Sequence, residues 1–277
     1  MKAEKLKDTT IFIFMTILSI AFLAPIFIVI MNSFKGKFYI SDAPFVFPTG
    51  NKFVGFSNYT NGINSTGFLQ AFGWSLFITV CSVVVIVLFT SMTAWYITRV
   101  KSKTTSALYY VFTFSMIVPF QMVMFTMTKV ANMLHIDNPF GIILIYLGFG
   151  AGLSVFMFSG FVKSIPLEIE EAAVIDGCNP IQTYFSVVFP ILKPIAITVS
   201  ILNAMWIWND YLLPYLIIGT DYKTIPIAVQ YLKGGYGSVD MGAMMAVLVL
   251  AIIPIVIFYF ICQRYIIEGV VAGAVKG

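Results

Sequence analysis

Four acidic residues stand close together in a polar stretch between Lys163 and Pro194, in a chain that is otherwise mostly apolar. They are Glu168, Glu170, Glu171 and Asp176. No Ser/His/Asp, Cys/His or carboxylate pair in the chain has catalytic spacing, so an enzyme is not indicated. A cluster of acids at this place must instead face water or a partner protein.

A second group of polar residues interrupts the fifth apolar run. It consists of Asn203, Trp206, Asn209 and Asp210. Asn203, Trp206 and Asp210 are spaced three and four apart, so a helix places them on one face. A carboxylate inside a membrane costs at least ~2.5 kcal/mol unless it meets water or a partner. We therefore expect this face to line a water-filled cavity, where an aromatic ring and amide groups suit a sugar. Two alternatives are an aromatic belt at headgroup level and a bond to a neighbouring helix.

The elements that must position the acids are two short helices joined by a glycine corner. Ser164 can cap the first helix, with Pro166 in its first turn. Gly177 can stop that helix in the left-handed conformation. Asn179 can cap the second helix, and Gln182 completes a capping box. We call residues 164–190 the elbow and expect it to be rigid.

The elbow resembles the EAA signature of the membrane subunits of binding-protein-dependent ABC importers. Glu171-Ala-Ala173 is followed after three residues by Gly177, and after nine more by Val187 and Phe189-Pro190. Val187 and Phe189 depart mildly from the Ile and Leu usual in the family. The resemblance implies a coupling helix that docks on a separate ATPase through Glu168, Glu171, Ala172, Ala173, Asp176, Gly177 and Pro190. The alternative is an amphipathic segment lying on the membrane, but such a helix would favour Lys and Arg over acids.

Composition agrees with a membrane protein. The chain is 60% hydrophobic and 10% charged, whereas soluble domains contain about 25% charged residues. Its net charge of +4 is scattered among apolar runs, which gives no nucleic-acid surface. Cys81, Cys178 and Cys262 lack metal or redox spacing. The apolar run after the N-terminal lysines is too long for a signal peptide, so we expect an uncleaved anchor.

The hydropathy pattern predicts an all-α, polytopic bundle in which residues 1–277 form a single transmembrane domain. Six apolar runs each approach the ~20 residues that a spanning helix needs. The expected spans are Ile11–Met31, Ala71–Thr98, Ala107–Val130, Gly141–Val162, Ile195–Ile218 and Gly242–Arg264. With the N-terminus inside, ten Lys and Arg residues fall in inner segments and six in outer ones. This bias favours an N-in, C-in topology in which the elbow lies on the cytoplasmic side of the membrane.

Several residues predict local features of these helices and loops. Pro119 suggests a kink in the third span, and Gly148, Gly150, Gly152 and Gly160 suggest that the fourth is closely packed. Hydroxyl side chains along the second span favour helix packing over pore lining. Residues 32–70 are expected to form a packed external cap. His135, the only histidine, is expected in a turn.

Two further segments narrow the resemblance to carbohydrate-uptake importers of the maltose, multiple-sugar and raffinose type. Trp208-Asn-Asp-Tyr211, followed by Pro214, resembles the corresponding helix of these permeases. The tail carrying Gly269, Gly273, Lys276 and Gly277 resembles that of the second permease, which reaches between the ATPase subunits. Its glycines disfavour a continued helix. The implied partners are a second related permease, an ATPase dimer, an extracellular sugar-binding protein and the lipid of a prokaryotic cell membrane.

The sequence contains no phosphate-binding G-x-x-x-x-G-K-[ST] motif. We therefore expect no cofactor in this chain, with ATP and Mg on the partner ATPase. Three hypotheses remain: an importer permease for a sugar, one for another solute such as glycerol phosphate or a polyamine, and an ion-coupled carrier or structural membrane subunit. The elbow favours the first two. A phosphorylated solute would need a basic cavity, and no Lys or Arg lies near the middle of a span, which favours a neutral solute.

Overall fold

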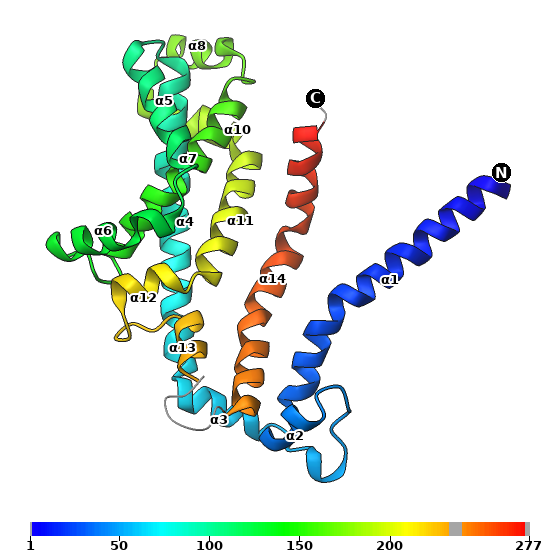
Figure 1. Cartoon of the computed structure of the whole chain (residues 1–277). Helices are drawn as coiled ribbons and strands as arrows, with labels where there is room; N and C mark the ends of the chain where they lie inside the picture. Colours follow the sequence, from blue (N-terminus) through cyan, green and yellow to red (C-terminus); the bar gives the residue numbers. More distant parts are fainter. Residues whose placement is uncertain (1, 233–239, 275–277) are drawn as a thin grey trace. The chain divides into compact units, whose positions relative to one another are not determined.

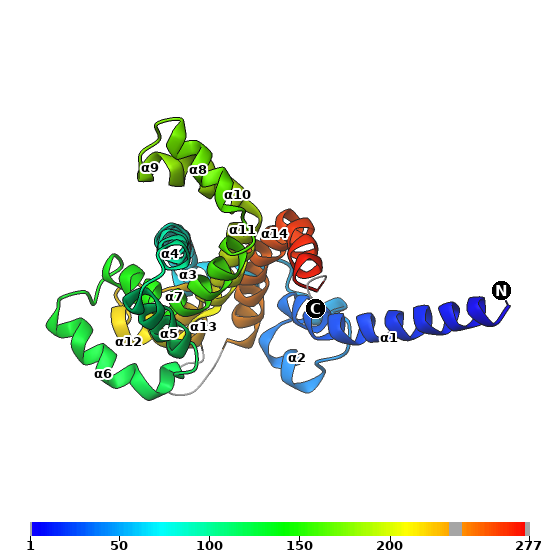
Figure 2. The same ribbon diagram turned by 90° about the horizontal axis from the view of Figure 1, so that it is seen from above.

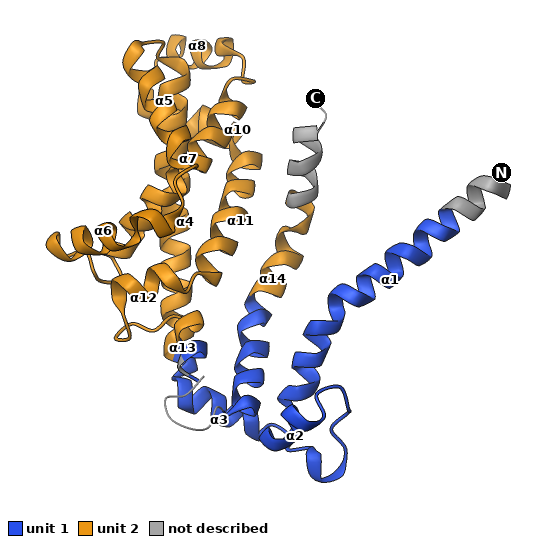
Figure 3. Ribbon diagram, viewed as in Figure 1, with its two compact units in different colours: residues 1–69, 228–254 blue, residues 70–227, 255–277 orange. Residues whose placement is uncertain are grey.

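A computed structural model describes the backbone of residues 2–232 and 240–274 and the side chains of 8–230, 232 and 240–265. Within these residues all regular elements are helices, apart from one isolated bridge between Lys35 and Phe53. The all-α prediction is therefore confirmed. The chain divides into two compact units, residues 1–69 with 228–254 and residues 70–227 with 255–277 (Figure 3).

Unit 1 contains residues 32–69 of the segment expected to form a packed cap, and several side chains of this segment contact one another. Its elements are α1 (Lys2–Ser33), α2 (Lys37–Asp42), the 3₁₀ helix η1 (Gly50–Lys52), α3 (Ser57–Thr66) and the first part of α14 (Met241–Ala274). The ring of Phe34 packs on Phe53, Phe56 and Tyr59 at centroid distances of 6.2, 5.6 and 5.4 Å. The side-chain amide of Asn58 donates to the Ser33 and Lys35 carbonyls, both at 2.8 Å.

Unit 2 holds the central bundle and the elbow. Its elements are α4 (Phe68–Arg99), α5 (Lys103–Ser115), α6 (Phe120–Met133), α7 (Gly141–Val162), α8 (Leu167–Ile175), α9 (Pro180–Thr183), the π-helix η2 (Tyr184–Val188), α10 (Phe189–Ile191), α11 (Lys193–Asn209), α12 (Leu212–Ile218) and the start of α13 (Ile225–Tyr231), whose remainder belongs to unit 1. Helices α5 and α11 pack on α7. Within this unit, α8 lies at the same end as the start of α5 (Figure 1).

Two of the four glycines expected to allow close packing of α7 do so. A Cβ on Gly150 would lie 2.7 Å from Ile86 Cδ1 and 2.9 Å from Asn203 Oδ1. A Cβ on Gly152 would lie 2.8 Å from the Phe112 carbonyl oxygen. Gly148 and Gly160 have no such neighbour within 4 Å, so the expectation is wrong for them. Gly150 and Gly152 therefore set how closely α4, α5 and α11 approach α7.

Four helices are long and apolar enough to span a membrane, and six spans result if each of two bent pairs counts as one. The continuous ones are Asp8–Ser33, Phe68–Arg99, Gly141–Val162 and Met241–Tyr265. The expected third span is not one helix, because α5 and α6 meet at 108°. Pro119 directly precedes α6 and has an extended backbone with ψ 138°. The sequence predicts a kink at this proline, but the helix is fully interrupted there.

The expected fifth span is also interrupted, since α11 ends at Asn209 and α12 begins at Leu212. Pro214 lacks the N–H that would bond the Asp210 carbonyl in a continuous helix. The Asp210 carboxylate instead accepts hydrogen bonds from the Leu212 and Leu213 N–H groups at 3.1 and 3.3 Å. These bonds restart the helix as α12. At its other end α11 meets the segment Pro180–Ile191 at a bend of 76°.

The turn between α6 and α7 contains His135 with φ 54°, which confirms that this histidine is a turn residue. At the other end of the chain, the expectation that glycines end the helix is wrong. The backbone of α14 continues through Gly269 and Gly273 to Ala274. A glycine costs only about 1 kcal/mol relative to alanine, which does not stop an established helix. Lys276 and Gly277 lie outside the described residues.

Candidate functional site

The elbow has the helix–glycine–helix geometry that its local sequence predicts. Helix α8 ends in a Schellman motif, in which the Cys178 N–H donates to the Ala173 carbonyl and the Gly177 N–H to the Val174 carbonyl, both at 3.0 Å. Gly177 has φ +87°, a left-handed conformation that glycine adopts without a steric penalty. Asn179 and Gln182 form a complete capping box, with both bonds at 2.9 Å. Figure 2 shows α8 and α9 extending to one side of α4, α7 and α11.

Ser164 does not cap the first helix as expected. Helix α8 begins at Leu167 with Pro166 as its N-cap residue and without a side-chain cap. The Ser164 hydroxyl instead donates to the Phe161 carbonyl at 2.7 Å. The reason is its distance in sequence, because a capping side chain bonds two or three residues ahead and here the helix starts too late.

Three of the four elbow acids, Glu168, Glu171 and Asp176, are exposed. Of the other predicted coupling residues, Ala172, Gly177 and Pro190 are exposed and Ala173 is buried. The same segment exposes Val174 and Ile175, the latter to 85%. A groove of about 520 Å³ runs beside them, lined by Trp95, Leu167, Glu170, Glu171, Val174, Ile175, Pro180 and Thr183. Acidic and apolar groups together thus form a surface that can bind another protein.

Glu170 differs from the other acids because it is buried against the end of α4. Its Oε1 accepts from Arg99 Nε at 2.8 Å and from Nη2 at 2.6 Å. Its Oε2 accepts from Trp95 Nε1 at 2.9 Å, and Arg99 Nη2 also donates to the Ile165 carbonyl at 3.0 Å. Glu170 was expected among the exposed acids of the elbow, and its burial corrects that expectation. The spacing of the elbow residues carried no signal for this role, because the partners Trp95 and Arg99 lie 75 and 71 residues away in the chain.

A second contact joins the elbow to α4. The Tyr184 and Ser91 hydroxyl oxygens lie 2.6 Å apart, and both residues are buried. The Tyr184 ring packs on Trp95 at a centroid distance of 5.5 Å. Tyr184 also belongs to a core cluster with Val188 and Leu192. This contact confirms the expectation that hydroxyls of the second span serve packing, as does Ser75, which accepts from the Ile225 N–H at 2.8 Å.

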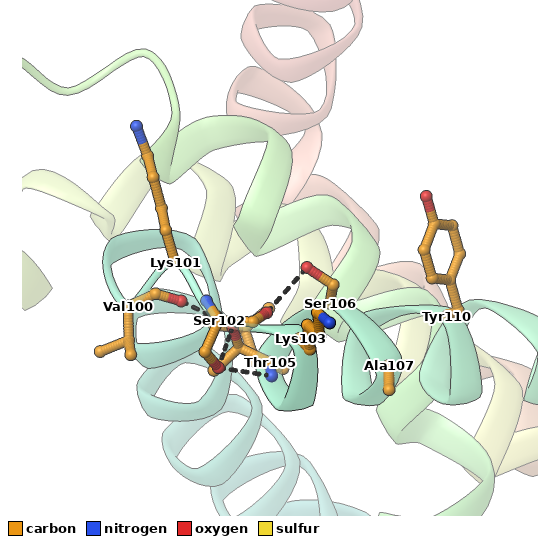
Figure 4. A pocket seen from close by; sticks show the side chains of 9 residues that line it. Val100, Lys101, Ser102, Lys103, Thr105, Ser106, Ala107 and Tyr110 are labelled. Atoms are coloured by element: carbon orange, nitrogen blue, oxygen red, sulfur yellow. Dashed lines mark hydrogen bonds between the residues drawn. The ribbon is translucent and has the colours of Figure 1, made fainter.

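The junction of α4 and α5, directly after Arg99, is also tightly bonded (Figure 4). Ser102 and Thr105 form a capping box at the start of α5, with both backbone-to-side-chain bonds at 3.1 Å. Thr105 Oγ1 additionally donates to the Val100 carbonyl at 2.6 Å. These bonds fix the Arg99 end of α4, beside the elbow.

Asn203, Trp206 and Asp210 do share a face, as their spacing predicts, because each contacts α7. The part of this face around Asn203 is closely packed. Asn203 is 5% exposed, and its amide donates to Ser154 Oγ at 3.2 Å and to the Val199 carbonyl at 2.9 Å. Contrary to our expectation, Asn203 therefore does not face a cavity in this structure. The Asn203 amide finds its partner in Ser154 of α7, a helix that the sequence alone did not place beside α11.

Around Asp210 the face is more open. The Tyr146 hydroxyl donates to Asp210 Oδ2 at 3.2 Å, and the Tyr146 ring lies edge-on to Trp206 at 5.4 Å. Asp210 is half-buried, whereas Trp206 and Asn209 are exposed. Tyr146, which sequence reasoning missed, is the fully buried residue that holds this group together. Of the four predicted substrate-path residues, Trp206 and Asn209 are thus the exposed ones.

Comparison with known proteins agrees with this geometry. Residues 86–271 match the family described as the binding-protein-dependent transport system inner membrane component. The chain is 39% identical, over 94% of both chains, to a probable starch degradation products transport permease (AmyC) of Thermoanaerobacterium thermosulfurigenes. It is 35% identical, over 99% of both chains, to the multiple sugar-binding transport permease MsmG of Streptococcus mutans.

A solved structure has the same fold. A chain of a bacterial ABC transporter involved in the import of the acidic polysaccharide alginate superposes with a TM-score of 0.79, covering 96% of this chain and 98% of that one, at 21% identity. The family match spans the elbow and all the residues that hold it, from Ser91 to Tyr184. The chain therefore belongs to the family of inner-membrane components of binding-protein-dependent transport systems, and it is a multi-pass transporter permease.

Proposed function

We propose that this chain forms half of the path by which a neutral sugar or oligosaccharide enters a prokaryotic cell, and that its elbow couples transport to ATP hydrolysis on a separate subunit. The observation that carries the proposal is the elbow itself. It presents Glu168, Glu171 and Asp176 beside exposed apolar residues, on the helix α8 that is fixed to α4. A rigid projecting surface of this kind can both grip a partner and transmit its motion.

The choice of a sugar is supported by the relatives and by charge. Similar permeases are named for starch degradation products, for multiple sugars and for melibiose, raffinose and stachyose. No Lys or Arg lies near the middle of a predicted span, so a phosphorylated solute would lack a counter-charge. Trp206 offers an aromatic ring and Asn209 an amide, which together suit the C–H faces and hydroxyl groups of a sugar.

The partners follow from what the chain lacks. It contains no phosphate-binding loop, so an ATPase dimer would bind ATP and Mg. Six spans leave too little room for a complete path, so a second, related permease would supply the other half, and an extracellular binding protein would deliver the sugar. We further propose an N-in, C-in topology, because ten Lys and Arg residues then fall in inner segments and six in outer ones. The basic residues Arg99, which binds Glu170 of α8, and Lys163, the C-cap residue of α7, then lie on the inner side with the elbow. The tail from Gly269 to Gly277 would contact the ATPase dimer.

The test is reconstitution of this chain in proteoliposomes with the permease, ATPase and binding protein encoded beside it. We expect neutral oligosaccharides to stimulate ATP hydrolysis and to be taken up. Glycerol phosphate and a polyamine, tested under the same conditions, should do neither. Stimulation by one of these charged solutes and not by sugars would refute the choice of substrate. Full transport by a homodimer of this chain would refute the heteromeric assembly.

A further inference from the structure

We propose that Trp95, Arg99 and Glu170 form a joint that makes α4 move together with α8, so that α4 carries the displacement of the elbow into the bundle. Although Glu170 lines the groove beside α8, its carboxylate is bound within the chain, and in this proposal it is a positioning residue and not a contact with the ATPase. The proposal rests on the coupling function proposed above and assigns it a path inside this subunit.

Every polar contact of the joint lies inside the chain. Arg99 binds Glu170 Oε1 through two nitrogens, and Trp95 binds the other carboxylate oxygen, so both oxygens are occupied. The side chain of Glu170 is 8% exposed and that of Arg99 is 19% exposed. Glu170 is therefore held inside the chain and offers little surface to a docking partner, whereas Glu171 beside it is exposed.

The joint has a second point of attachment on the same face of α4. Ser91, Trp95 and Arg99 follow one another at intervals of four residues, which places them in line along one side of the helix. Ser91 bonds Tyr184 in η2, and Arg99 bonds Glu170 in α8. Trp95 contacts both, through its N–H to Glu170 and its ring on Tyr184. One face of α4 thus holds α8, which precedes the glycine corner, and η2, which follows it, along about 12 Å of its length.

Burial is what makes this contact rigid. A displacement of α8 from α4 that breaks the ion pair without admitting water would leave a carboxylate and a guanidinium unpaired in a poorly solvated site, which is strongly unfavourable. The two chain connections of the elbow are less stiff, because one is the turn at Lys163–Pro166 and the other the 76° bend before α11. The contact with α4 is consequently a direct link between the elbow and the bundle that does not pass through these two connections.

The first experiment measures sugar uptake per ATP hydrolysed in the reconstituted complex. We expect E170Q and R99Q to assemble and hydrolyse ATP, but to lose about two- to thirtyfold in uptake per ATP, the range found for residues that transmit coupling. R99K should recover part of the loss, because it keeps the charge without the fork of donors. The matched control K101Q, which removes an exposed cation two residues away, should behave as wild type. Wild-type uptake per ATP in E170Q and R99Q would overturn the proposal.

Should E170Q and R99Q fail to assemble, W95F carries the same test. It removes the N–H that binds Glu170 and retains a ring to pack on Tyr184. Wild-type uptake per ATP in W95F would then assign the cluster to stability alone and overturn the joint. A reduced ratio with normal assembly would support it.

The second experiment needs no transported solute and uses Cys178, the half-exposed residue after the glycine corner. The full chain carrying C81S and C262S is purified in detergent and treated with a water-soluble maleimide. We expect several-fold faster labelling of Cys178 in E170Q and R99Q, because a released elbow exposes this thiol, and no change in K101Q. Unchanged labelling would overturn the joint. A wild-type complex that takes up no sugar would instead count against the proposed substrate, and the Cys178 result would still decide whether the joint exists.

Discussion

Replacing Gly177 by valine should misplace the second arm of the elbow. Gly177 has φ +87°, and a Cβ added there would meet no atom within 4 Å. The cost of valine is therefore backbone strain and not a clash. An L-residue in the left-handed conformation costs about 1–2 kcal/mol. Since 1.4 kcal/mol corresponds to a factor of ten, the correctly bent elbow should become about 5- to 30-fold less populated relative to alternatives.

The assay compares G177V with two other variants in the reconstituted complex. G177N should be milder, because asparagine enters the left-handed region more readily than other side chains. G160V is the matched control, since Gly160 also has no neighbour within 4 Å but lies in the regular helix α7. We expect substrate-stimulated ATP hydrolysis to fall in the order wild type and G160V, then G177N, then G177V, with membrane insertion unchanged. Equal activity of G177V and G160V would refute both the strain argument and the coupling role of this corner.

Three further outcomes can be measured. In N203C the cysteine should resist a small polar thiol reagent, because this position is buried. In N209C the cysteine should react, and transported sugar should slow the reaction, because this position is exposed. Rapid labelling of N203C would contradict the packing of Asn203 on α7. D210A should lower the stability of the purified chain by about 0.5–2 kcal/mol through loss of the α12 cap, and D210N should be close to wild type, so equal loss in both would exclude a capping role. Burial, reinforced by the charge of Lys52, lowers the pKa of Lys35 below its ordinary 10.5. The unfolded chain then binds more protons between the two pKa values, so thermal stability should rise with pH through that window, and K35M should reduce this dependence.

The coupling elbow could be predicted from sequence in considerable detail because its interactions are local. The Schellman motif at Gly177 and the capping box from Asn179 to Gln182 each join residues at most five positions apart. Their geometry follows from residue type and spacing alone. The wrong prediction at Ser164 also concerns a local interaction. The N-cap of α8 is Pro166, two residues later than expected, so the first N–H groups of the helix lie beyond the reach of the Ser164 hydroxyl.

Hydropathy located the apolar segments but not their bends. A count of apolar residues gives the same score to a straight helix and to two helices meeting at 108°, as α5 and α6 do. The break after Asn209 needed both Pro214, which removes a backbone donor, and the Asp210 carboxylate, which caps the new helix. The sequence marks Asp210 only as a costly charge in a membrane, whereas the structure shows that its carboxylate bonds the first N–H groups of α12.

The sequence by itself determined the class of protein, the all-α fold and the helix–glycine–helix form of the elbow, because composition and short-range bonding specify these. It could not decide which of two adjacent glutamates faces a partner and which is buried. That depends on Arg99, 71 residues away in the chain, and on Trp95, both brought to α8 by the packing of the bundle. It likewise could not decide that Asn203 bonds Ser154, 49 residues away. Contacts over such separations arise only when the helices pack, so the tertiary structure alone assigns these residues.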